Sequence, residues 1–218
     1  MAKKKSAYHH GDLKAALLEL AEREIERQSF EKITLQELTE ALGVQPSAAY
    51  RHFRNREFLL RSLAKRGFDR WDQEIKSLLI ETPPEGRAKA IFRFFLQYAQ
   101  DQPQMYRLMF VSDFGRDHRS ISGMLSFLAF EAALSEVMPP AEEEEVRTAL
   151  LATWTTLHGA SLLLIEGRLQ RFYLGNMDTP ALVDYLLELH FDAILQRERS
   201  RSDLPDRARI SKVASACD

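Results

Sequence analysis

Apolar positions recur every three or four residues along most of the chain, and no stretch shows a convincing alternation of period two. This spacing is typical of helices that bury one face. The sequence therefore predicts an all-α fold of about nine helices. The first is expected from Asp12 to about Gln28, with Leu13, Leu17 and Leu20 on its buried side.

Two short helices in close succession are predicted next. Thr34 and Glu37 stand three residues apart, so each side chain can satisfy the free backbone N–H of the other at a helix start. Gly43 comes where a left-handed residue ends many helices. Pro46 suits the first turn of a second helix, with Gln45 as a weak N-cap. Two helices hinged at a glycine are the form of a DNA-binding helix-turn-helix, although a plain helical hairpin without a ligand shows the same pattern.

The second short helix presents a face that suits a DNA major groove. Val44, Ala49 and Phe53 are expected on its packed side. On the other side, Ser47 is expected to donate to a base edge and the Ala48 methyl to meet a thymine methyl, while the aromatic and basic residues that follow reach phosphates. The predicted DNA-contacting residues are Thr34, Gln45, Pro46, Ser47, Ala48, Tyr50, Arg51, His52, Arg54 and Arg56.

Basic residues gather around this segment. Between Arg51 and Arg66 there are six basic residues and one acid, Glu57, whereas the whole chain carries a net charge of −2. A basic surface attracts DNA phosphates in a salt-dependent way. The lysine run at residues 3–5 either adds an arm along the DNA or is simply solvated.

A long helix is predicted after this segment. Asn55 is a good N-cap, and nothing breaks the pattern before Pro83, so the helix should run some 25 residues, or about 38 Å. It is long enough to link two domains. We expect a helix-turn-helix DNA-binding domain with a basic N-terminal arm over residues 1–54, a helical effector-binding and dimerisation domain over residues 55–198, and a disordered tail over residues 199–218.

Five further helices are predicted beyond the proline pair at residues 83 and 84. The first is expected to end near Pro103, the second to cover a short stretch around Met109, and the third to stop before Pro139. The last two are expected to run from Glu142 to about Leu169 and from Pro180 to about Glu198. The last two have apolar positions on more than one side. Pairing with the same helices of a second copy would cover these positions in a four-helix bundle and give a homodimer. A well-buried helix pair in a monomer is the alternative.

Aromatic and methionine side chains are concentrated in these later helices. They suit the wall of a site for a small apolar molecule with one or two polar atoms, and His158 is the best polar candidate for orienting it. Stripes of this kind are also typical of an ordinary core. The candidate ligand-binding residues are Phe94, Phe95, Tyr98, Met105, Met109, Phe110, Phe127, Trp154 and His158.

Other function classes find little support in the sequence. It has no Gly-x-Ser-x-Gly elbow, His-Glu-x-x-His pair or Gly-rich phosphate loop, so we expect no enzyme activity, no cofactor and no metal. His9, His10 and Asp12 are poor candidate metal ligands, because adjacent histidines do not easily share one ion. Cys217 lies too near the chain end to pair within the fold. No run approaches the roughly 18 apolar residues of a membrane helix, and no secretory signal is visible, so a cytoplasmic protein is expected.

Several motifs together resemble those of TetR-family transcriptional regulators. The N-terminal ones are Tyr8-His9-His10-Gly11-Asp12-Leu13, Leu42-Gly43-Val44 and the stretch from Tyr50 to Leu60. Further along, the stretch from Pro103 to Phe110 and Trp154-Thr155-Thr156-Leu157-His158-Gly159 are similar to the C-terminal domain named for its Trp-His-Gly signature.

The resemblance implies an all-helical homodimer that binds a palindromic double-stranded operator. It also implies release of the operator when a small hydrophobic effector enters the C-terminal domain. A non-inducible or activating regulator is the alternative. A nucleoid-type DNA-binding protein is a weaker one, since it would want a larger positive charge.

Overall fold

The computed structural model describes residues 13–116, 122–138, 143–168 and 179–196. These residues form nine α-helices and contain no strand, which confirms the predicted all-α class. The α-helices are α1 (Leu13–Gln28), α2 (Leu35–Leu42), α3 (Pro46–Tyr50), α4 (Arg56–Glu81), α5 (Pro84–Asp101), α6 (Pro103–Tyr106), α8 (Ser122–Val137), α9 (Glu143–Ile165) and α11 (Thr179–Gln196). Shorter turns are η1 (Phe30–Lys32), η2 (Arg107–Val111) and η3 (Asp113–Gly115).

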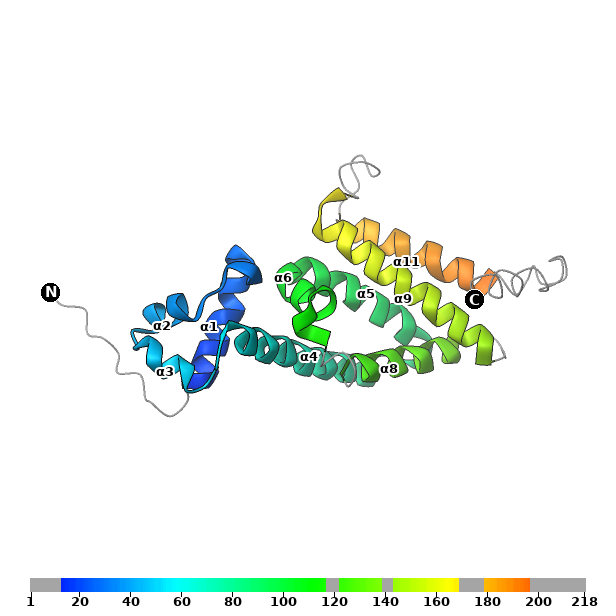
Figure 1. Cartoon of the computed structure of the whole chain (residues 1–218). Coiled ribbons are helices and arrows are strands. Elements are labelled where there is room, and N and C mark those ends of the chain that lie inside the picture. The colour runs from blue at the N-terminus through cyan, green and yellow to red at the C-terminus, as the bar shows by residue number, and fades with distance from the viewer. Residues whose placement is uncertain (1–12, 117–121, 139–142, 169–178, 197–218) are drawn as a thin grey trace, which may run out of the picture.

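Helices α1, α2 and α3 make a small unit at one end of the molecule (Figure 1). The predicted capping box at the start of α2 is present: Thr34 accepts from the Glu37 N–H at 3.2 Å, and the Glu37 carboxylate accepts from the Thr34 N–H at 3.2 Å. Gly43 ends α2 with φ 69°, in the left-handed region, as predicted. Local side-chain chemistry thus sets both ends of the first helix of the pair.

Helix α3 differs from its prediction in two ways. Gln45 makes no side-chain capping hydrogen bond, so its predicted capping role is wrong. The Gln side chain is longer than those of Ser, Thr, Asp and Asn, the residues that usually cap a helix. The helix also ends at Tyr50, because the N–H groups of His52 and Phe53 both turn back to the Ala49 carbonyl. The last residues of the predicted helix therefore form a turn.

Helix α4 is the long connection that the sequence predicts. It has 26 residues, or about 39 Å at 1.5 Å per residue, and Asn55 caps it by accepting from the Phe58 N–H at 2.9 Å. Figure 1 shows α4 running from the α1–α3 unit along the molecule to α8. The C-terminal helices are organised around α5, which packs on α8, α9 and α11.

Several predictions concern residues outside the described part of the chain. The predicted basic arm, the residues His9, His10 and Asp12, and the predicted tail from residue 199 all lie outside the described residues. Within them, α9 is the one helix long and apolar enough to cross a membrane. It packs on α5 and α8 and buries its own core positions, as the central helix of a helical bundle does.

Candidate functional site

The predicted DNA-contacting face is exposed at the end of the molecule farthest from α9 and α11 (Figure 1). Ala49 and Phe53 are buried and anchor α3, so the other side of the helix faces outward. The exposed members of the predicted set are Thr34, Gln45, Pro46, Ser47, Tyr50, Arg51, His52 and Arg54. Ala48 is half-buried against the core, which leaves less of its methyl for a base contact than predicted.

Arg56, which is predicted to contact DNA, has its guanidinium engaged within the protein. Its guanidinium donates to the carbonyl oxygens of Ile33 and Phe30, both at 2.7 Å, and of Glu31 at 2.8 Å. A guanidinium that already holds three carbonyls has few donors left for phosphate. Arg56 therefore ties the first turn of α4 to the segment before α2. We leave it out of the proposed DNA-contacting set.

Several of the basic residues between Arg51 and Arg66 already have partners within the protein. Arg61 pairs with Glu57 at 2.9 Å and Lys65 with Asp69 at 2.7 Å. The Arg54 guanidinium lies 4.9 Å from the centre of the exposed Phe58 ring, an arrangement that fixes its direction. Two of the six basic residues are thus paired with acids within α4 and are less available to a partner than the predicted set beside α3.

An aromatic cluster fills the region between α4, α5, η2 and α9. It includes Trp71 on α4, whose ring lies 4.8 Å from Phe94, 4.9 Å from Phe95 and 4.8 Å from Tyr98. The predicted ligand-binding residues all contribute to this region. Phe95, Met105, Met109 and Phe110 are buried in it, whereas Phe94, Tyr98, Phe127, Trp154 and His158 are half-buried. Each is part of a packed core.

Two members of this cluster were missed from the sequence. Trp71 falls on the buried stripe of α4 with Ala64 and Ile75, and this spacing is the signal that could have indicated it. Tyr106 is buried, and its hydroxyl lies 2.7 Å from Nδ1 of His158. Burial raises the pKa of Tyr106 well above its usual range, and the Ser161 side chain acts in the opposite direction. The phenol therefore stays protonated and can donate.

Helix α4 comes unusually close to the methionines of the cluster. A Cβ placed on Gly67 would lie 2.6 Å from the Met109 sulfur and 2.9 Å from the Met105 sulfur. Glycine lets the α4 backbone approach this closely. The two methionine side chains therefore rest directly on the helix that connects to the α1–α3 unit.

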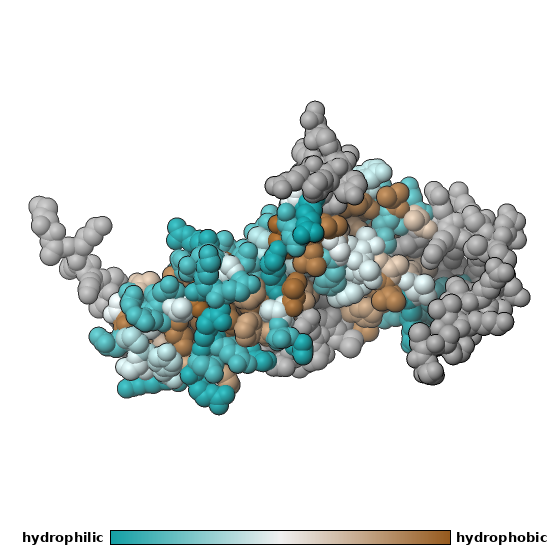
Figure 2. All heavy atoms as spheres, turned by 45° about the horizontal axis from the view of Figure 1, so that its top comes forward, coloured by the Kyte–Doolittle hydropathy of each residue, from teal (hydrophilic) through white to brown (hydrophobic). Residues whose placement is uncertain are grey.

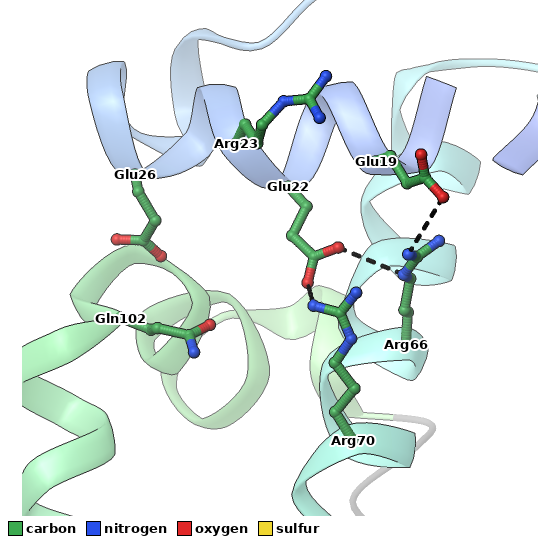
Figure 3. Close-up of a pocket in the computed structure, with 7 residues that line it drawn as sticks. All are labelled: Glu19, Glu22, Arg23, Glu26, Arg66, Arg70 and Gln102. Carbon is green, nitrogen blue, oxygen red and sulfur yellow. Dashed lines mark hydrogen bonds and ion pairs between the residues drawn. The ribbon is translucent and has the colours of Figure 1, made fainter. Parts of the chain in front are cut away.

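An interdomain groove lies between the α1–α3 unit and the C-terminal helices. It is open, has a volume of about 470 Å³ and is lined by Glu19, Glu22, Arg23, Glu26, Arg66, Arg70 and Gln102. Figure 3 shows α1 on one side and α4 with the α5–α6 turn on the other. Glu22 pairs with Arg66 at 3.3 Å and with Arg70, so one carboxylate of α1 holds two arginines of α4.

Glu26 makes the second link across the interdomain groove. Its carboxylate accepts from the backbone N–H groups of Met105 at 2.7 Å and Gln104 at 3.2 Å, in the first turn of α6. Burial raises the pKa of Glu26, and these two hydrogen bonds act in the opposite direction. Helix α1 is therefore bonded both to α4 and to the short helix that carries Met105 and Tyr106 into the aromatic cluster.

Comparisons with known proteins agree with this architecture. Two family models match: bacterial regulatory proteins of the tetR family over residues 17–63, and the tetracyclin repressor-like C-terminal domain over residues 88–190. The chain belongs to the TetR family and is a transcriptional regulator with a DNA-binding helix-turn-helix. No curated protein matches it significantly.

Solved structures share the fold at low sequence identity. A protein of unknown function from Rhodococcus sp. RHA1 is 23% identical, with a TM-score of 0.68, over 88% of this chain and 98% of the other. FadR from Bacillus subtilis, in complex with stearoyl-CoA, is 15% identical, with a TM-score of 0.60, over 81% and 97%. The TetR-family regulator PfmR from Thermus thermophilus is 18% identical, with a TM-score of 0.56, over 83% and 97%.

Proposed function

We propose that this regulator is a repressor that leaves a palindromic operator when a small hydrophobic effector binds among its C-terminal helices. The observation that carries the proposal is the pair of links across the interdomain groove. They start from α1 and join the α1–α3 unit to α4 and to α6, which both contact the aromatic cluster. These ion pairs and hydrogen bonds would transmit a change of packing in that cluster to the DNA-contacting residues.

The proposed contacts to DNA come from the exposed side of α2 and α3. Ser47, exposed at the start of α3, would reach a base edge, whereas the exposed Tyr50, Arg51 and His52 would contact phosphates. Gln45, Pro46, Ala48 and Arg54 flank them, and Thr34 lies at the start of α2. Since few of these groups distinguish bases, specificity rests on the spacing of two such units as well as on side chains.

A homodimer supplies the second unit. Helices α9 and α11 keep large apolar side chains exposed: Leu151 at 65%, Tyr185 at 52% and Leu189 at 56%. Apolar (brown) patches also mark the C-terminal part of the surface in Figure 2. Pairing of α9 and α11 with the same helices of a second copy would bury them. Two α3 helices would then enter successive major grooves about 34–36 Å apart.

Effector binding would act by favouring a different distance between the two α3 helices of the dimer. Moving the population from 1:99 to 99:1 requires a preference of about 5.5 kcal/mol for the state that does not bind DNA. An apolar effector suits the aromatic cluster, and the structural neighbour FadR in complex with stearoyl-CoA is an example of a similar fold with a ligand that has a long apolar chain. The proposed location is the cytoplasm, where operator DNA lies.

The double variant Tyr50→Ala with His52→Ala tests the proposed DNA contacts. Both side chains are exposed, so the variant should keep its helicity and its dimer mass while its affinity for a duplex carrying its own promoter falls. A matched control is Gln73→Ala with Lys76→Ala, two exposed positions on α4 beyond the α1–α3 unit. Unchanged promoter affinity in the first variant would refute the placement of the DNA-contacting face.

The alternative functions give different results in the same assay. A non-inducible or activating regulator binds the promoter specifically but is not released by any hydrophobic compound. A nucleoid-type protein binds shuffled DNA of equal length as strongly as the promoter.

A further inference from the structure

A polar centre lies inside the aromatic cluster. It consists of Tyr106, His158 and Ser161, with the Tyr106 hydroxyl 2.7 Å from Nδ1 of His158 and the Ser161 hydroxyl beside the phenol. Tyr106 and Ser161 are fully buried. The surrounding rings are apolar: the His158 ring lies 5.1 Å from Phe95 and 4.9 Å from Trp154.

Ser161 differs from every other hydroxyl residue of α9. Four threonines of this helix, Thr148, Thr153, Thr155 and Thr156, each donate to the carbonyl oxygen four residues earlier, at 2.7 to 2.9 Å. Ser161 makes no such bond, and its buried Oγ has no hydrogen bond of ordinary geometry among the described residues. A buried hydroxyl without a partner costs about 1–3 kcal/mol, so it calls for an explanation.

This geometry leaves the Ser161 hydroxyl available to a polar group of a bound ligand. A hydroxyl both donates and accepts, and the protonated Tyr106 phenol beside it does the same. Neither Ser161 nor the protonated Tyr106 carries a charge that could compensate a buried anion or cation, and the neighbouring Phe95 and Phe110 rings carry none. Burying an unpaired ion among such groups is costly, whereas a neutral acceptor would satisfy the serine.

From this arrangement we infer the chemical class of the effector, an inference that rests on the proposed function. The effector is an uncharged molecule with a flat apolar body and one hydrogen-bond acceptor, such as a ketone. The body packs against Phe95 and Trp154, and the acceptor receives the Ser161 hydroxyl next to Tyr106 and His158. The polar centre thereby selects one neutral acceptor group among otherwise similar apolar molecules.

Three matched probes test this inference by isothermal titration calorimetry. They are 2-acetylnaphthalene, its hydrocarbon isostere 2-isopropenylnaphthalene, and the anion 2-naphthoate. The ketone should bind the wild-type protein about five- to tenfold more tightly than the isostere, the factor expected for one buried neutral hydrogen bond. It should also bind more tightly than the carboxylate, because moving an anion from water into this mostly apolar cluster costs more than moving a neutral ketone.

Ser161→Ala should abolish the difference between ketone and isostere. The matched control is Ser135→Ala, which removes an exposed hydroxyl that donates to the Glu131 carbonyl and should keep the difference. Without ligand, Ser161→Ala should melt no lower than the wild type, because its hydroxyl has no ordinary partner to lose. Folding of the variant is therefore not in question.

Three results would overturn the inference: equal affinities for ketone and isostere, a difference that survives in Ser161→Ala, or no binding of any probe. The proposed function is tested separately by adding the ketone to the complex with promoter DNA. If the ketone binds as inferred but DNA stays bound, the site assignment stands and ligand-induced release is wrong.

Discussion

Replacement of Arg56 by methionine is the most direct test of how the DNA-contacting unit is held on α4. Methionine keeps an unbranched apolar stem and removes every donor that reaches Phe30, Glu31 and Ile33. The bonds to Phe30 and Ile33 are part-buried, and the bond to Glu31 is exposed. Hydrogen bonds to a charged group contribute about 1.5–3 kcal/mol when buried and far less when water can replace them.

The expected loss follows from these three bonds. Two part-buried bonds at about 1.5 kcal/mol each, with nothing counted for the exposed one, give a loss of about 3 kcal/mol for Arg56→Met. For a chain of this length, that loss should lower the melting temperature by about 6–12 °C. Thermal unfolding followed by circular dichroism at fixed protein concentration measures the change.

Arg61→Met is the matched control. Arg61 lies one turn and a half further along α4 and pairs with the exposed Glu57, so its replacement should cost no more than about 1 kcal/mol. A melting temperature for Arg56→Met that equals the control would show that water replaces the three bonds without cost, and the scaffolding role would be refuted.

Arg56→Lys separates the two roles considered for this residue. Lysine keeps the charge but presents its donors from a single nitrogen, which cannot reproduce the fork that spans three carbonyls. A scaffolding arginine predicts a lower melting temperature with DNA affinity retained in the folded protein. A phosphate contact in place of scaffolding predicts an unchanged melting temperature.

Three further predictions concern other parts of the fold. Gly43→Ala should destabilise the protein by about 1 kcal/mol in urea unfolding, because alanine must adopt φ 69° there; an equal midpoint would contradict this. Glu26 has a raised pKa in the folded state, so its contribution to stability is greatest below its ordinary value of 4.5 and is lost as the pH rises through the raised value; Glu26→Gln should remove this component from a series of melts between about pH 4 and neutral pH. Leu151→Asp with Leu189→Asp should yield monomers in sedimentation, whereas the exposed Ile80→Asp on α4 should not; an intact dimer in the first variant would refute the proposed interface.

Features set by neighbouring residues were predictable from the sequence. The capping box at Thr34, the left-handed Gly43 and the Asn55 cap all act within three or four residues, and the structure has each where the pattern placed it. The long α4 follows from the absence of any break before Pro83. Local chemistry also explains why the class and order of the helices were predictable.

Features that depend on distant residues were not predictable. Arg56 binds carbonyls 23 to 26 residues away, and Glu26 caps a helix 78 and 79 residues further along the chain. The bond from Tyr106 to His158 spans 52 residues. A charge count treats these groups as solvated side chains, because it contains no information on what folds against them. The interdomain groove and the polar centre therefore emerge only from the packing of α1 on α6 and of α9 beside η2.

We propose that two copies of the exposed α3 helix hold one operator at a fixed spacing. Footprinting of the protein on DNA that carries its own promoter tests this claim most directly. We expect two protected half-sites related by a dyad, with centres about 34–36 Å apart along the DNA, and loss of both when Tyr50→Ala is combined with His52→Ala. Uniform protection without a dyad, or a footprint that survives the double variant, would contradict it.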